Sequence, residues 1–260
     1  IGMIGKGTID YNEANQAADG TQNTIATIWC NVGTCFVGEG LEVRNAKKFN
    51  FLIAAYRHCD VDNLNFDTAS DVIHFLGPGT ETVCSGIRGK SGDDTLAFTV
   101  GDVPWFNLSR GDFNSIRVDN LNADSSQALI RISGHAGGKF YDVKLSNLYG
   151  SSVASPVTIA DFGEDLQGMD FDHIKIDGVN CETLTQVPIV AVSTLTAGGG
   201  DRLDVSVTQL LSNGVALQIN AATTTVKSVQ LKVANPIDGC TTTCTSLTSP
   251  TTTTPQPPST

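Results

Sequence analysis

A short apolar motif recurs along the chain and constrains its fold more than any other feature of the sequence. The motif is an apolar residue, two further positions and a second apolar residue, usually followed closely by a Gly or Asn turn. Its copies are spaced by 23, 34, 27, 31 and 31 residues, and a weaker copy follows at Leu231. The copies are Val61/Leu64, Cys84/Ile87, Val118/Leu121, Leu145/Leu148, Ile176/Val179 and Val207/Leu210. Such self-similarity predicts stacked structural repeats.

A second apolar pair, with strict alternation, follows each copy and tracks its spacing. These pairs are Ile73/Phe75, Leu96/Phe98, Ile130/Ile132, Val157/Ile159, Ile189/Ala191 and Leu217/Ile219. Alternation sends one face of a short strand inward, and stacked repeats can bury a face that a single repeat cannot. The sequence therefore predicts an all-β fold, namely a single right-handed parallel β-helix. The alternatives are an antiparallel sandwich and a propeller, which do not predict that two motifs shift together.

Composition supports this fold and divides the chain near residue 238. The 260 residues include 26 Gly and many turn-forming and β-branched residues, so helix is expected to be minor. We expect the β-helix to span residues 1–237. From Asp238 onward the chain is rich in Thr, Ser and Pro. Residues 238–260 are therefore expected to be a linker, or an extended C-terminal arm that packs on another subunit.

Charge and cysteine usage argue against several classes of function. The net charge of -11 would repel a phosphate backbone, so nucleic acid is not an expected partner. The chain has no apolar run of about 18 residues and its N-terminus does not resemble a signal peptide, so no membrane insertion is expected. The seven cysteines lack the spacing of a zinc site. We expect most of them in the core of a chain that folds in a reducing cytoplasm, with no metal or cofactor.

Alignment of the repeats brings three carboxylates to one corner. Asp94 lies 23 residues, one repeat, after Asp71, and Asp93 is its neighbour. Asp71 and Asp94 are therefore expected about 4.8 Å apart at the backbone. Crowded like charges raise the pKa of at least one group, which gives a proton donor beside acceptors, as glycosidic cleavage requires. The alternative is that these aspartates only form turns at strand ends.

The segments DTASDVIHFLGPG (67–79) and IRGKSGDDTLAF (87–98) resemble the pectate-lyase-like phage tailspike and tail-fibre proteins and, more distantly, polygalacturonase-type glycosidases. The likeness covers residues 41–98 best. It implies that Asp93 is the general acid, that Asp71 and Asp94 hold the attacking water, and that cleavage inverts the anomeric centre. It also implies a homotrimer that works with other virion tail proteins.

The chain departs from the polygalacturonase pattern in ways that favour other functions. Val72 stands where the family has Gly, and neither a Gly-His-Gly nor an Arg-x-Lys motif follows the acidic pair. A non-catalytic receptor-binding or structural tail-fibre module is therefore the main alternative. A third candidate is a calcium-dependent polysaccharide lyase, in which the aspartates bind the metal and Arg131 abstracts the proton.

Several residues near the acids are candidates for substrate binding. One outward-facing column is expected to run through His74, Ala97, Arg131 and Thr158, and His74 and Arg131 suit sugar hydroxyls or carboxylates. Trp105, with Phe106, lies in an insertion expected over residues 99–112 and offers an aromatic platform for a sugar ring. Lys90, like Arg88, precedes the acids and is expected to offset their repulsion; we add Lys90 to the binding candidates. We expect His135 to lie in a surface loop instead.

These features lead to one expectation and its rivals. The expected protein is a tailspike-type depolymerase that binds and hydrolyses a bacterial surface polysaccharide. It would be exposed to the host cell surface on the virion tail after folding in the host cytoplasm. The sequence leaves the glycan, its linkage and the host open.

Overall fold

The computed structural model describes residues 1–15, 28–102, 110–135, 137–162, 169–184, 187–194, 202–211, 217–221 and 225–232. The expected Thr/Pro-rich arm at 238–260 therefore lies outside the described residues, as do Trp105 and Phe106. Within the described ranges the chain is all-β, with nineteen strands and one short 3-10 helix, η1 (Glu13–Asn15). Among these residues, no helix has the length and hydropathy that a membrane span requires.

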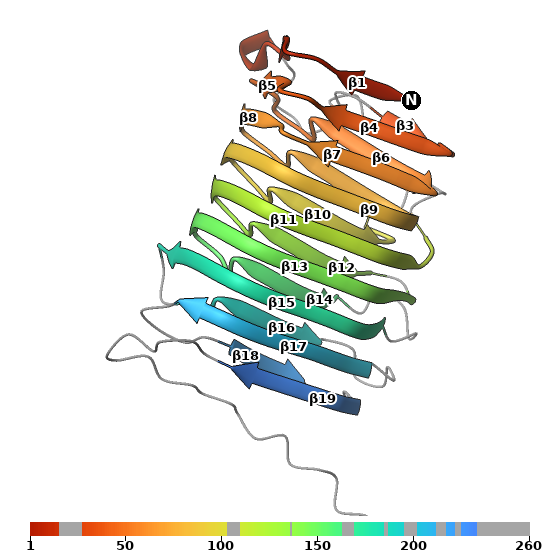
Figure 1. Ribbon diagram of the computed structural model, residues 1–260, viewed down its shortest axis with the longest axis vertical. Helices are drawn as coiled ribbons and strands as arrows, with labels where there is room; N and C mark the ends of the chain where they lie inside the picture. The colour runs from red at the N-terminus through yellow and green to blue at the C-terminus, as the bar shows by residue number, and fades with distance from the viewer. Residues whose placement is uncertain are drawn as a thin grey trace, which may run out of the picture.

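Short strands at the N-terminal end are followed by an alternation of long and short strands (Figure 1). The N-terminal strands are β1 (Gly2–Ile4), β2 (Thr8–Asp10), β3 (Ile28–Cys30), β4 (Thr34–Gly38), β5 (Glu42–Arg44), β6 (Phe51–Tyr56), β7 (His58–Asp62) and β8 (Asn65–Thr68). The long strands are β9 (Ile73–Ser91), β11 (Phe113–Ser125), β13 (Gly138–Ser152), β15 (Met169–Thr183), β17 (Arg202–Leu211) and β19 (Thr225–Lys232). The short strands between them are β10 (Leu96–Val100), β12 (Ile130–Gly134), β14 (Val157–Asp161), β16 (Val190–Thr194) and β18 (Leu217–Ala221).

Every strand pairs in parallel with its equivalent in the next repeat. The long strands form the series β9–β11–β13–β15–β17–β19, and the short ones form β10–β12–β14–β16–β18. The two series meet at β9, whose first residues pair with β10 and β6. All strand pairs of the described residues are parallel, in one large sheet that is not closed. The predicted all-β class with parallel strands is confirmed, and the antiparallel sandwich is wrong.

A backbone bend explains the spacing of the first motif. Residues three apart on a straight strand point to opposite faces, yet Val118 and Leu121 of β11 are both buried. Between them, Asn120 has a left-handed φ of 53°, which turns the strand so that both side chains point inward. Asn147 (φ 53°) and Gly178 (φ 68°) occupy the equivalent positions of β13 and β15. Asn and Gly tolerate this conformation best, which is why they accompany the motif.

Aromatic side chains stack through a core to which the short and the long strands both contribute. The Phe75 and Phe98 rings of adjacent repeats stack with centroids 4.7 Å apart. On the long strands, Phe113 stacks on Phe140 at 5.0 Å. Phe98 meets Phe113 edge-on at 5.9 Å, which joins the two series. The inward pairs from Ile73/Phe75 to Val157/Ile159 therefore belong to one continuous core.

One predicted inward pair is wrong by a single residue. The strand register places Val190 opposite Val157 and Val192 opposite Ile159, so the inward pair is Val190/Val192, in place of Ile189/Ala191. Both valines are buried, whereas Ala191 is only partly buried. Ile189 is also buried, just before β16, and this made the pattern ambiguous. A slip of one residue exchanges the two faces of a strand.

The cysteines behave largely as predicted. Of the five that the structure describes, four are buried free thiols, at Cys35, Cys59, Cys84 and Cys181. Cys30 is exposed. Burial raises the pKa of Cys181 to about 12, so this thiol stays protonated and inert at neutral pH.

Candidate active site

The parallel strand register places Asp71 and Asp94 on successive repeats. Asp71 precedes β9, and Asp93 and Asp94 lie between β9 and β10. Ile73 pairs with Leu96, which sets Asp71 beside Asp94. The Asp94 amide donates a hydrogen bond to Asp71 Oδ1 at 3.3 Å, and the Val72 amide donates to the Asp94 carbonyl. The backbone ladder itself therefore builds the corner.

The structure brings the three predicted carboxylates together. One oxygen from each of Asp71, Asp93 and Asp94 lies within 4.8 Å of the others. Asp71 and Asp94 are buried, whereas Asp93 is only half-buried. Ser91 and Ser125 hydroxyls donate to the Asp93 carbonyl at 3.0 and 2.6 Å and fix the turn that carries this carboxyl. Asp93 is thus the member of the trio that solvent can reach.

Crowding and burial favour the protonated form of two of these groups. Burial, and then the Asp71 charge, raise the pKa of Asp94 to about 7, against the opposing effect of Arg131. Burial and the Asp71 charge also raise the pKa of Asp93. A carboxyl with a raised pKa is a proton donor near neutral pH, as the sequence argument required.

Protein groups already neutralise much of the negative charge of the trio. Arg131 Nε on β12 lies 2.7 Å from Asp94 Oδ2, and the Ala128 amide donates to Asp94 Oδ1 at 3.0 Å. His74 Nδ1 lies 2.7 Å from Asp71 Oδ2. Two cationic side chains therefore occupy positions where a bound metal would have to compete with them. This donor set does not favour the calcium site of the lyase hypothesis.

The predicted outward column exists, but part of it is covered. The strand register aligns His74, Ala97, Arg131 and Thr158. His74 is buried, with the Phe49 ring 4.5 Å from its own, and both its nitrogens contact protein groups. His74 was predicted to bind sugar directly, and the structure corrects this, because a buried imidazole does not reach a ligand on the surface. Arg131 is partly exposed and stays a candidate.

Lys90 is exposed and lies beside acidic residues of both neighbouring strands. It lies on β9, between Asp67 of β8 and Asp124 of β11. Its charge therefore lies on the outer surface of the long strands. Trp105 falls in a segment outside the described residues, so its role stays a prediction.

The sequence reasoning missed two residues of the site. Asp102 Oδ2 lies 3.2 Å from His74 Nε2, and Asp102 Oδ1 lies 3.0 Å from His135 Nε2. His135 lies just beyond β12, in the loop that the sequence predicts, but it is partly buried against the Phe162 ring instead of standing free on the surface. Val100 pairs with Gly134, and extending this register past the strand ends would have placed Asp102 near His135.

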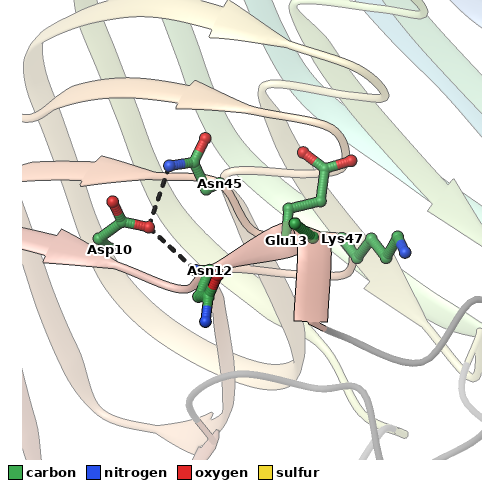
Figure 2. A pocket seen from close by; sticks show the side chains of 6 residues that line it. Asp10, Asn12, Glu13, Asn45 and Lys47 are labelled. Atoms are coloured by element: carbon green, nitrogen blue, oxygen red, sulfur yellow. Dashed lines mark hydrogen bonds between the residues drawn. The ribbon is translucent and has the colours of Figure 1, made fainter.

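Two surface pockets lie elsewhere, and none of the trio lines either of them. The first, of about 440 Å³, is lined by Asp10, Asn12, Glu13, Ala14, Asn45 and Lys47 (Figure 2). Asp10 accepts hydrogen bonds from the Asn45 side chain and the Asn12 amide, and these lower its pKa. It is therefore no proton donor at neutral pH.

The second pocket is a groove of about 460 Å³ at the bend of the long strands. It is lined by Arg117, Val118, Asp119, Lys144, Ser146, Asn147, Asp177 and Gly178. The strand register sets two rows across this pocket: Arg117 pairs with Lys144 in a cationic row, and Asp119 pairs with Ser146, which pairs with Asp177, in a second row. Ligand sites commonly have volumes of about 300–1,000 Å³.

Comparison of the chain with protein-family models, with curated proteins and with solved structures found no match.

Proposed function

We propose that the chain is a right-handed parallel β-helix that cleaves a bacterial surface polysaccharide, as a tailspike-type depolymerase does. The parallel pairing of each strand with its equivalent in the next repeat supports the winding. Parallel strands need a crossover connection, and such crossovers are right-handed in about 98% of cases. Assembly as a homotrimer with other proteins of a virion tail, and folding in the host cytoplasm, rest on the sequence resemblance.

The observation that carries the proposal is the half-buried Asp93 carboxyl beside two buried ones. Its pKa is raised by burial and by Asp71, so it retains a proton at a higher pH than a free aspartate. It is also the member of the trio that a glycosidic oxygen can approach. We assign to Asp93 the role of general acid, which protonates the leaving oxygen. Asp71 provides the negative charge that activates water and stabilises the developing oxocarbenium ion, and Asp94, whose pKa is raised to about 7, shares this role in its ionised form.

The distances between the three carboxyl groups bear on whether cleavage inverts or retains the anomeric configuration. The resemblance implies inversion, which typically uses carboxyls about 6.5–9.5 Å apart, with a water between them. The oxygens here lie within 4.8 Å, nearer to the spacing of about 5–5.5 Å in retaining enzymes. The anomer of the first product, followed by NMR during cleavage, distinguishes the two outcomes.

The proposal is tested by the release of reducing ends from capsular polysaccharides and teichoic acids. The wild type should release them from at least one glycan of a broad panel. Asp93→Asn should lower the rate at least about 100-fold, the contribution of a general acid. Asp67→Asn, which removes an exposed carboxylate of β8, should match the wild type. A cleaving chain whose Asp93→Asn variant keeps full turnover would show that the assignment is wrong.

A non-catalytic tail-fibre module that binds glycan is the second candidate. The burial of Asp71 and Asp94, each held by protein partners, favours it, because neither carboxylate lies open to water. The groove at the bend of the long strands supplies a binding surface of suitable size. Retention on a glycan array without any product, with Lys144→Ala weakening the retention, would support this function over hydrolysis.

The lyase candidate requires Arg131 as a base. Arg131 lies 2.7 Å from a carboxylate of Asp94, and a guanidinium in such a pair holds its proton firmly. Absorbance from an unsaturated product would nevertheless identify a lyase directly.

A further inference from the structure

Asp71 of the trio and three neighbouring side chains form a row of alternating carboxylates and imidazoles. Asp71 Oδ2 lies 2.7 Å from His74 Nδ1, and Asp102 Oδ2 lies 3.2 Å from His74 Nε2. Asp102 Oδ1 lies 3.0 Å from His135 Nε2. The row crosses three repeats, from the start of β9 to the end of β12.

His74 is enclosed at the inner end of this row. Its side chain and that of Asp71 are each only 4% exposed, whereas Asp102 is 29% exposed. The Thr99 hydroxyl lies 2.8 Å from His74 Nε2, and the Phe49 ring packs on the imidazole. A histidine this enclosed depends on its neighbours for its protonation state.

The geometry favours one state. An ionised carboxylate only accepts hydrogen bonds, so the imidazole donates at Nδ1 toward Asp71. At Nε2 the Thr99 hydroxyl, 2.8 Å away, can donate or accept, whereas the Asp102 carboxylate at 3.2 Å only accepts, which favours a proton on this nitrogen as well. An imidazole that donates at both nitrogens is an imidazolium. Two carboxylates thus flank one buried cation. Their negative charges offset the free-energy cost of removing the imidazolium from water.

We propose that Asp102 is a positioning residue that holds His74 as an imidazolium and, through it, fixes the Asp71 carboxylate beside Asp93 and Asp94. His135 holds the second oxygen of Asp102 and so orients it. This inference rests on the proposed function for its catalytic meaning, although the charge state of His74 stands independently of any activity.

The electrostatics agree with this geometry. Burial disfavours the charged imidazole, but hydrogen bonds with Asp102 and Asp71 outweigh it and raise the pKa of His74 to about 9. Burial also opposes ionisation of Asp102, yet hydrogen bonds from His135 and His74 hold its pKa far below the ordinary value. Asp93 also acts on His74, and Arg131 lies two strands away in the same column.

Nitrogen NMR of the histidine rings tests the proposal without a substrate. The chain has four histidines, so ¹⁵N-histidine labelling gives four ring patterns, assigned with single His→Gln variants. At pH 7.5 the wild-type His74 ring should show two protonated nitrogens. In Asp102→Asn its pKa should fall by about 1–3 pH units, the effect of losing one adjacent opposite charge.

A second histidine with two carboxylate neighbours provides the matched control. His58 lies 2.9 Å from Asp60 and 3.4 Å from Glu81, but at the surface. Asp60→Asn should lower the pKa of His58 and leave the His74 signals unchanged. A wild-type His74 that is neutral at pH 7.5 would overturn the proposal, even if Asp102→Asn fails to fold. An unchanged His74 titration in a folded Asp102→Asn would overturn it as well.

Kinetics then separates positioning from simple structural support. If the wild type cleaves a glycan, Asp102→Asn should move the pH–rate profile, whereas a structural loss would scale the rate equally at every pH. If the pKa of His74 falls in Asp102→Asn but the wild type cleaves no glycan, the proposed hydrolysis is refuted. The charge state of His74 is then still established. Cleavage with an unmoved profile in Asp102→Asn would refute the positioning role alone.

Discussion

Replacement of Asp94 by Asn should remove a large part of the pH dependence of stability. Folding raises the pKa of this buried carboxyl from 3.8 to about 7. Between these values the folded state binds a proton that the unfolded state has released, so the free energy of unfolding falls as pH rises. At about 1.36 kcal/mol per pH unit, the full effect is about 4 kcal/mol, of which about 2.5 kcal/mol falls between pH 5 and pH 8.

Asn keeps the geometry of the site and loses the titration. Its side-chain oxygen can still accept from the Ala128 amide, and the partly exposed Arg131 can turn to solvent. Thermal unfolding of both proteins, followed by circular dichroism at pH 5 and pH 8, gives the comparison. For a chain of this size, about 2.5 kcal/mol corresponds to about 5–10 °C. The wild type should lose that much more than Asp94→Asn between the two pH values.

A variant with the same pH dependence as the wild type would refute this reasoning. It would mean that Asp94 titrates normally and that the trio does not perturb its members. Because the comparison is a difference between two proteins, titrating groups distant from Asp94 contribute equally to both and cancel, whereas the interactions of Asp94 with Asp71, Asp93 and Arg131 belong to the measured difference.

Three further predictions concern the fold. Phe98→Ala removes a ring stacked on Phe75 and should cost about 3–5 kcal/mol in denaturant unfolding, whereas Tyr149→Ala on the exposed face should cost under about 1 kcal/mol. Gly150→Ala should destabilise by about 1–3 kcal/mol, because Gly150 has φ 116° and a Cβ would collide with the Ala123 carbonyl; Gly7→Ala, with open space around it, should be nearly neutral in the same assay. Finally, Cys35, Cys59, Cys84 and Cys181 should resist a thiol reagent until the chain unfolds, while Cys30 reacts at once; fast labelling of the buried four in the native protein would contradict the described packing.

Strand positions could be predicted from the sequence wherever burial and alternation coincide. Phe75 and Phe98 were placed in register because both segments carry the same pattern of two large apolar residues around a polar or small one, Ile73–His74–Phe75 and Leu96–Ala97–Phe98. The same rule failed at β16, where Ile189, Val190 and Val192 are all buried and the alternation has two solutions. The structure selects the solution that the parallel hydrogen bonds allow.

The residues of the candidate site also fall into those that the sequence predicts and those that it does not. Asp71 and Asp94 were brought together because a spacing of 23 residues converts directly into neighbouring parallel strands. Asp102 and His135 lie just beyond strand ends, where no alternation marks which way a side chain turns. Their contact depends on loop conformation, and His74 is covered by Phe49, which sequence spacing does not reveal.

The most direct test of the proposed hydrolysis follows the oxygen of water into the product. Glycan is incubated with the chain in H₂¹⁸O, and the fragments are weighed by mass spectrometry alongside those made by Asp93→Asn. Hydrolysis predicts one ¹⁸O at each newly formed reducing end, with fragments absent from the variant. Fragments that lack the elements of water, or no fragments from any glycan that the chain binds, would contradict a hydrolytic centre at Asp71, Asp93 and Asp94.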